Sequence, residues 1–225
     1  MKFELLDSLI IVTIESKNYL VDTGSNMSFS LNHKDLNLVI NGNHYLLKPN
    51  PVSANVKDTL YHLIPGKVVD GVIGTNIICE TSLTIDYLNQ EIYFEAVKCK
   101  YDIEQYSMPL NIKMGLIYTE LKSRAKTLSV ILDTGAKIHY VKESYLDKTK
   151  SRGYFEDYSP DLGHMEGHLF DFYDSIHDET VTAGILPAVY NYACDMIMSV
   201  YLMARPGFCS FDFVKGEFKF TRRFI

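Results

Sequence analysis

Short stretches in which hydrophobic and polar residues alternate cover most of the chain, and they are rich in β-branched and aromatic residues. Runs of about four to eight such residues, separated by turn dipeptides such as Asn41-Gly42, are typical of β-strands. Helical periodicity is confined to three short segments, residues 33–36, 142–152 and 185–193. The pattern therefore predicts a mostly β protein.

One motif occurs twice, as LVDTGS at residues 20–25 and as ILDTGA at residues 131–136. Each copy follows an apolar strand, a polar turn and a second apolar strand. With ordinary residue usage, two accidental copies of Asp-Thr-Gly would be roughly a one-in-a-thousand event. The repeat therefore indicates a duplicated structure.

Two further pairs of segments match in the same order. VDGVIGTNII (69–78) corresponds to CDMIMSVYLM (194–203), and LTIDYLNQEIYFE (83–95) corresponds to CSFDFVKGEFKF (209–220). The alignment makes four aspartates equivalent in pairs, Asp70 with Asp195 and Asp86 with Asp212. Because aspartates beside turns commonly accept backbone hydrogen bonds, we expect structural roles for these four.

Three matched landmarks predict two similar lobes. We expect an N-terminal lobe over residues 1–98, a connection over 99–108 and a C-terminal lobe over 109–225. Periodicity lapses in the charged connection, and Pro109 is expected to stop any strand there.

Charge and length narrow the range of partners. A chain of 225 residues with a formal net charge of −6 has no long basic run, which argues against nucleic acid or an anionic membrane as the main partner. Glu4 and Asp7 interrupt the N-terminal apolar run, so we expect no signal peptide and a cytoplasmic location. No run reaches the ~18 apolar residues of a membrane-spanning helix.

Neither the cysteines nor the histidines suggest a metal site. The cysteines lack CxxC spacing and are expected to be reduced thiols rather than disulfides; they are Cys79, Cys99, Cys194 and Cys209. His164 and His168 flank Glu166 as HxExH, which differs from the HExxH zinc motif, and nearby glycines disfavour a helix. Surface-loop histidines are the expected alternative.

Both halves resemble the lobes of aspartic proteases, the pepsin-like and retropepsin group. The resemblance rests on apolar-apolar-Asp-Thr-Gly in each half, and on the segment 70–74 (DGVIG), which is similar to the element that closes the family's ψ-shaped loop. It implies a bilobal pepsin-like fold, two β-barrel-like lobes related by a pseudo-two-fold axis, with the two Asp-Thr-Gly loops at their interface. Because one chain carries both motifs, we expect a monomer.

The resemblance implies an aspartic-type endopeptidase with Asp22 and Asp133 as the catalytic pair. Two adjacent carboxyl groups do not both ionise readily, so one keeps its proton while the other acts as a base, as is known for this family's dyad. The pair would activate a water against an extended peptide or protein substrate in the interlobe cleft. No cofactor or metal is expected.

The residues beside the aspartates are expected to support them. Thr23, Gly24 and Ser25 follow the first aspartate, and Thr134, Gly135 and Ala136 follow the second. Each glycine allows a sharp turn, and each threonine can hydrogen-bond locally or across to the other loop. We expect the Ser25 hydroxyl to bond the neighbouring carboxylate, whereas Ala136 cannot. With one hydroxyl rather than two, the pair should be less acidic and active at mildly acidic to near-neutral pH.

The chain departs from the family at the flap, a hairpin that the N-terminal lobe places over the cleft in pepsin-like members. Only 45 residues separate Gly24 from Asp70. Tyr45 and Tyr61 are the candidates for an aromatic flap residue, with buried sheet tyrosine as the alternative. Residues 151–179 of the second lobe are a candidate for a substrate-facing loop or a flap-like hairpin.

The second lobe also departs in its ψ-like element. Ser199 stands in place of Gly74, and Met196 stands in place of Gly71, which could distort the loop that carries Asp133. This leaves two alternatives open: a catalytically silent pepsin-fold protein that binds peptides or proteins or acts as an inhibitor or scaffold, and a processing enzyme with one intended target.

Overall fold

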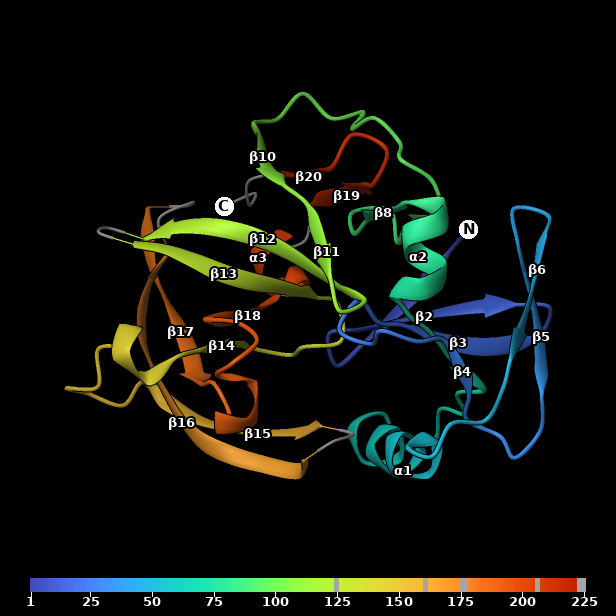
Figure 1. Cartoon of the computed structure of the whole chain (residues 1–225), viewed down its shortest axis with the longest axis horizontal. Coiled ribbons are helices and arrows are strands. Elements are labelled where there is room, and N and C mark those ends of the chain that lie inside the picture. The colour runs from blue at the N-terminus through green and yellow to red at the C-terminus, as the bar shows by residue number, and fades with distance from the viewer. Residues whose placement is uncertain (124–125, 160–161, 175–177, 205–206, 222–225) are drawn as a thin grey trace.

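The computed structural model describes residues 1–123, 126–159, 162–174, 178–204 and 207–221. Strands provide most of the regular structure, as the hydrophobic pattern predicts, and they form three large sheets and a two-stranded sheet. Figure 1 shows the strands of residues 9–47 on one side and the strands of residues 116–199 on the other. We call residues 1–98 the first half of the molecule and residues 109–225 the second half.

The first sheet carries the first Asp-Thr-Gly loop. Its order is β1 (Phe3–Leu6), β2 (Leu9–Ile14), β3 (Lys17–Val21), β7 (Gly71–Ile73) and β4 (Phe29–Ser30). β3 ends directly before Asp22 and runs parallel to β7, with Leu20 opposite Val72. β7 is antiparallel to β4. The strand β7 thus lies between β3 and β4, which the first Asp-Thr-Gly loop joins.

The second sheet repeats this arrangement within eight strands. Its order is β11 (Asn111–Lys113), β12 (Leu116–Ser123), β13 (Lys126–Asp133), β18 (Met196–Ser199), β14 (His139–Val141), β17 (Glu179–Ile185), β16 (Gly163–Asp174) and β15 (Gly153–Ser159). β13 and β18 are parallel with Ile131 opposite Ile197, and β18 is antiparallel to β14. The register therefore matches the predicted alignment of the two halves.

The third sheet joins the two halves. Its order is β10 (Gln105–Pro109), β20 (Glu217–Thr221), β19 (Phe208–Asp212), β8 (Leu83–Asp86) and β9 (Glu91–Tyr93). The two predicted hairpins, β8–β9 and β19–β20, pair directly through β19 and β8. Thr84 and Ser210, which the alignment makes equivalent, lie opposite each other, and their buried hydroxyl oxygens are 2.9 Å apart. Pro109 ends the edge strand β10, which begins inside the predicted connection.

Helices are few, and the sequence pattern misplaced them. Among the described residues the α-helices are α1 (Ser53–Leu63), α2 (Thr75–Thr81) and α3 (Val200–Ala204), and none of them falls in a predicted segment. Residues 142–152 and 185–193 contain only single 3₁₀ turns, at Glu143–Tyr145 and Ala188–Tyr190, and residues 33–36 contain no helix. Pro187 keeps Leu186 out of a helix, because proline disfavours the α conformation of the residue before it.

The small sheet of β5 (Leu36–Ile40) and β6 (Asn43–Leu47) lies at the edge of the first half (Figure 1).

All four cysteines are free. Within the described residues, no helix is long and apolar enough to cross a membrane.

Candidate active site

The two Asp-Thr-Gly loops are fixed by hydrogen bonds to each other. The backbone N–H of Thr23 donates to the hydroxyl oxygen of Thr134 at 2.9 Å, and the N–H of Thr134 donates to that of Thr23 at 2.9 Å. Each hydroxyl in turn donates across the interface, from Thr23 to the Leu132 carbonyl at 2.8 Å and from Thr134 to the Val21 carbonyl at 2.9 Å. Both threonines are buried, so these bonds satisfy groups that water does not reach.

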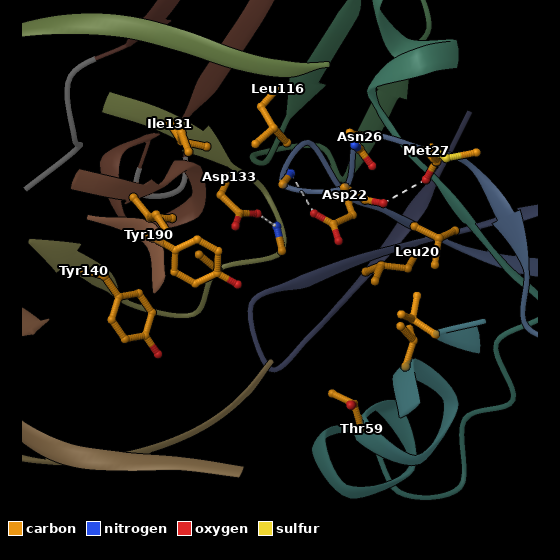
Figure 2. Close-up of a pocket in the computed structure, with 18 of the residues that line it drawn as sticks. Leu20, Asp22, Asn26, Met27, Thr59, Leu116, Ile131, Asp133, Tyr140 and Tyr190 are labelled. Carbon is orange, nitrogen blue, oxygen red and sulfur yellow. Dashed lines mark hydrogen bonds between the residues drawn. The ribbon is translucent and has the colours of Figure 1, made fainter. Parts of the chain in front are cut away.

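The aspartates face each other at the centre of this junction (Figure 2). Asp22 Oδ1 accepts the N–H of Gly24 at 2.8 Å, and Asp133 Oδ1 accepts the N–H of Gly135 at 2.7 Å. The two carboxyl groups lie within hydrogen-bonding reach of each other. Each loop therefore presents its carboxyl group at a defined position rather than on a freely rotating side chain.

Each glycine is needed because it packs against the opposite aspartate. A Cβ at Gly24 would lie 2.4 Å from Asp133 Oδ2, and a Cβ at Gly135 would lie 2.8 Å from Asp22 Oδ1. Separations this short do not occur between non-bonded atoms, so any side chain would displace a carboxyl group. The glycines thus permit the close approach of the two aspartates.

Burial raises the pKa of Asp22 and holds the pKa of Asp133 well above its ordinary value, where the negative charge of Asp22 adds to the effect. The N–H groups of Gly24 and Gly135 act in the opposite direction, because they stabilise the ionised carboxylates. Over a range of pH the pair consequently shares one proton, and its titration belongs to both residues together.

The prediction for Ser25 is wrong. Its hydroxyl donates to the Met27 carbonyl at 2.8 Å rather than to a carboxylate (Figure 2). A serine readily bonds the backbone two residues on, and this local bond turns the hydroxyl away from Asp22. Ala136 is buried and has no hydroxyl group. Burial and backbone N–H groups, rather than a serine hydroxyl, therefore set the acidity of the pair.

The expected distortion of the second loop is also absent from the structure. The N–H of Gly74 donates to Ser28 Oγ at 2.8 Å, and at the equivalent position the N–H of Ser199 donates to His139 Nδ1 at 3.2 Å. Ser199 is fully buried, and its Oγ accepts the N–H of Leu202 at 3.3 Å, within α3. Ser199 therefore fits because His139 accepts its N–H and Leu202 donates to its hydroxyl oxygen.

Met196 is likewise accommodated. It lies opposite Val130 in the parallel pair β13 and β18, and its side chain is buried in the core. Its counterpart Gly71 lies opposite Tyr19 in the first half. The strand pairing that supports Asp133 is consequently the same as the pairing that supports Asp22.

The four repeated aspartates have the structural roles that were predicted. Asp70 Oδ2 accepts the N–H of Asn18 at 2.9 Å, and Asp195 Oδ2 accepts the N–H of Ser129 at 3.0 Å. The turn aspartates of the third sheet each accept the N–H of the residue three positions later, in the pairs Asp86 with Asn89 and Asp212 with Lys215. All four therefore accept backbone hydrogen bonds, Asp86 and Asp212 within their own turns and Asp70 and Asp195 from neighbouring strands.

A cavity of about 450 Å³ lies over the two aspartates and is lined by both halves. Its walls contain four pairs of equivalent residues, Leu9 and Leu116, Leu20 and Ile131, Phe29 and Tyr140, and Val72 and Ile197. Figure 2 shows several of these side chains on either side of the aspartates. The duplication thus supplies two facing half-cavities of related shape.

The covers of the two half-cavities differ. In the first half, α1 contributes Val56, Thr59 and Leu60 to the lining. In the second half, the hairpin of β15 and β16 contributes Asp157 and Met165. Helix α1 and β15 lie next to each other, so the two covers meet over the cavity (Figure 1).

Neither predicted flap tyrosine lines the cavity. The Tyr45 hydroxyl donates to Glu80 Oε2 at 3.3 Å and the ring packs against the core, while Tyr61 is exposed on α1. The hairpin over the cavity comes instead from the second half, within the segment 151–179 that is predicted as a flap-like hairpin. The spacing of Val56 and Leu60 was the signal that could have revealed α1.

The histidines at 164 and 168 are exposed, as expected, but they lie in strand β16 rather than in a loop. Among the described residues, no group of three or more His, Cys, Asp or Glu side chains could hold a metal ion.

No protein-family model matches the chain, and no curated protein matches it in sequence.

Proposed function

We propose that the protein is an aspartic-type endopeptidase with a bilobal, pepsin-like arrangement of two lobes. The observation that carries the proposal is the pair Asp22 and Asp133, held within hydrogen-bonding reach on two reciprocally bonded loops at the base of a cavity. The pairing of equivalent residues at two separate places, Thr23 with Thr134 and Thr84 with Ser210, supports a pseudo-two-fold axis between the lobes.

The shared proton gives the two carboxyl groups different tasks. The ionised member takes a proton from a water molecule as the water oxygen attacks the peptide carbonyl, and the protonated member donates its proton to the carbonyl oxygen. Collapse of the resulting tetrahedral intermediate breaks the C–N bond, and a proton passes to the leaving amine. No covalent acyl-enzyme is formed, and either aspartate can begin as the base because the pair titrates as a unit.

The cavity suits an extended peptide. Its walls are mostly apolar, and three large exposed side chains, Met27, Met114 and Tyr192, also line it and offer further contact to a chain that extends beyond the centre. The two covers reduce the access of bulk water to the aspartates, which strengthens electrostatic interactions between them and a bound substrate.

Burial of the two aspartates supports activity at a pH above the range in which ordinary carboxyl groups titrate. Because the pKa values of Asp22 and Asp133 are raised, the singly protonated state of the pair should extend into mildly acidic and near-neutral pH. An optimum near pH 2 with no activity at pH 6 would contradict this expectation.

The test is digestion of a peptide library between about pH 3 and 8. We expect Asp22→Asn and Asp133→Asn each to reduce cleavage by at least about a thousandfold, and pepstatin to inhibit the unmodified protein. Asp35→Asn, at an exposed position, serves as the matched control. Cleavage that persists in both active-site variants would contradict the assignment, and peptide binding without cleavage by the unmodified protein would favour a silent binding protein.

A further inference from the structure

The two half-cavities differ in one polar pair. Phe29 in the first half is replaced at the equivalent position by Tyr140, and the Tyr140 hydroxyl donates to Asp157 Oδ2 at 2.5 Å. Asp157 comes from β15, has only 7% of its surface exposed and lines the cavity. Other lining residues also differ between the halves, but among the described ones only Asp157 adds a carboxyl group to those of Asp22 and Asp133.

Burial, together with the negative charge of Asp157, raises the pKa of Tyr140. The phenol therefore keeps its proton throughout the working range of pH and remains a hydrogen-bond donor. The hydrogen bond from the Tyr140 hydroxyl orients the carboxyl group of Asp157 at the wall of the cavity.

Acidic side chains are the charged groups of this cavity. Three carboxyl groups line it, from Asp22, Asp133 and Asp157, and among the described residues no Lys, Arg or His side chain does. This set of side chains favours a ligand group with a positive charge over one with a negative charge. In a recess with apolar walls such charged groups act on a ligand more strongly than they would in water.

A second opening lies beside Asp157 and has both acidic and basic side chains in its wall. It lies between the end of α1, the hairpin and the turn at Asp7, and it is lined by Asp7, His62, Leu63, Lys137, Glu156, Asp157 and His164. The Lys137 ammonium is already paired with Asp7 at 2.6 Å. Asp157 therefore lines both the cavity and this second opening, whereas Glu156 lines only the second opening.

We propose that the second half-cavity selects a substrate side chain with a positive charge, lysine or arginine, whereas the first half-cavity selects an aliphatic or aromatic side chain. This inference rests on the proposed function, because it assigns the substrate class of the same site. The oriented carboxylate of Asp157 would accept hydrogen bonds from the cation, while the stem of the lysine or arginine packs against Ile131 and Ile197.

Matched peptides test the proposal directly. Each pair carries lysine or norleucine, which has a similar stem without the charge, on one side of the cleaved bond and leucine on the other. We expect lysine to raise kcat/KM by about tenfold or more on one side of the bond only. Asp157→Asn should abolish this preference while norleucine peptides are still cleaved, and Glu156→Gln, the neighbouring acidic residue, should retain it.

A binding measurement separates this inference from the proposed function. The same peptides are titrated against Asp22→Asn, with and without Asp157→Asn, at low and high salt. A lysine preference that disappears with Asp157→Asn supports the inference even if the unmodified protein cleaves nothing. Equal binding of lysine and norleucine peptides, or a preference that survives Asp157→Asn, overturns it.

We expect Asp157→Asn to fold, because an asparagine side-chain oxygen can still accept a hydrogen bond from the Tyr140 hydroxyl. Thermal melting checks this point. If Asp157→Asn does not fold, Asp157→Glu and Tyr140→Phe provide the test, because the first should keep the lysine preference and the second should weaken it.

Discussion

The two halves of the molecule support their Asp-Thr-Gly loops by equivalent hydrogen bonds that different residues make. In the first half, a glycine N–H at position 74 donates to Ser28; in the second, a serine N–H at position 199 donates to His139. The donor is a backbone group in both halves, whereas the acceptor is a hydroxyl in one and an imidazole in the other. The duplicated feature is therefore the hydrogen-bonding role, and the side chains vary around it.

The halves remain alike where they contact each other and differ where they would contact a substrate. Thr23 bonds to Thr134 and Thr84 lies against Ser210, so like residues meet at the junction. Away from the junction, a helix covers one half-cavity and a hairpin covers the other. Contacts between the halves constrain the residues at the junction, whereas among the described residues no such contact requires α1 and the β15–β16 hairpin to be alike.

The largest effect should come from the two glycines that pack against the aspartates. Gly24→Ala would place a Cβ 2.4 Å from Asp133 Oδ2, and Gly135→Ala would place one 2.8 Å from Asp22 Oδ1. Because a displacement of about 1 Å in a reacting group costs on the order of a hundredfold in rate, we expect both variants to lose peptidase activity by at least that factor. The loss should be greater for Gly24→Ala, and initial rates on one peptide substrate measure it.

The exposed turn glycine Gly42 offers a control, although its positive φ of 81° means that Gly42→Ala will cost some stability. Activity per folded molecule should still be unchanged in that variant. If Gly24→Ala and Gly135→Ala retained full activity, the close packing of glycine against the opposite aspartate would not matter for function.

Much of the central structure could be predicted from sequence because it depends on local patterns. Alternating residues indicated the strands, and the repeated landmarks aligned Val72 with Ile197, which occupy matching registers opposite Leu20 and Ile131. The positions of the aspartates beside turns predicted that their carboxyl groups accept backbone hydrogen bonds. Such features are determined by neighbouring residues in the chain, so a single sequence reveals them.

What could not be predicted depends on competition between partners. Ser25 had a carboxylate and a carbonyl within reach, and only the folded loop decides in favour of Met27. Ser199 looked disruptive beside Gly74 because its compensating partner, His139, lies 60 positions away in sequence. Helix α1 was missed because its apolar side is narrow, and its burial against the first sheet is a tertiary effect.

Exchange of the supporting residues tests whether the two loops are interchangeable. Gly74→Ser would place a Cβ 2.4 Å from the Met27 carbonyl oxygen, so we expect a loss of about 2–3 kcal/mol in the free energy of unfolding. Ser199→Gly removes the hydroxyl that accepts from Leu202 and adds backbone freedom, at about 1 kcal/mol. Urea denaturation measures both. Equal costs would contradict the view that each serine or glycine is matched to its own surroundings.

The smallest expected effect is a pH-dependent gain in stability on removal of one carboxyl group. The pKa of Asp133 is well above its ordinary value in the folded protein, because burial and the charge of Asp22 disfavour its ionised form. An acid with a raised folded pKa costs no stability below its ordinary pKa, near 4, and destabilises the fold increasingly as the pH rises above that value. Asp133→Asn should therefore melt at the same temperature as the unmodified protein near pH 3 and on the order of 3 °C higher near pH 7.

The comparison between the halves sharpens this last measurement. Asp22→Asn should act in the same direction, since the pKa of Asp22 is also raised, and either change removes the repulsion between the two carboxylates. Asp35→Asn, at an exposed position, should leave the difference near zero at every pH. Melting curves between about pH 3 and 7 report all three variants. A gain for Asp133→Asn that is constant with pH would show that packing, rather than the cost of ionising a buried pair, determines the stability of this junction.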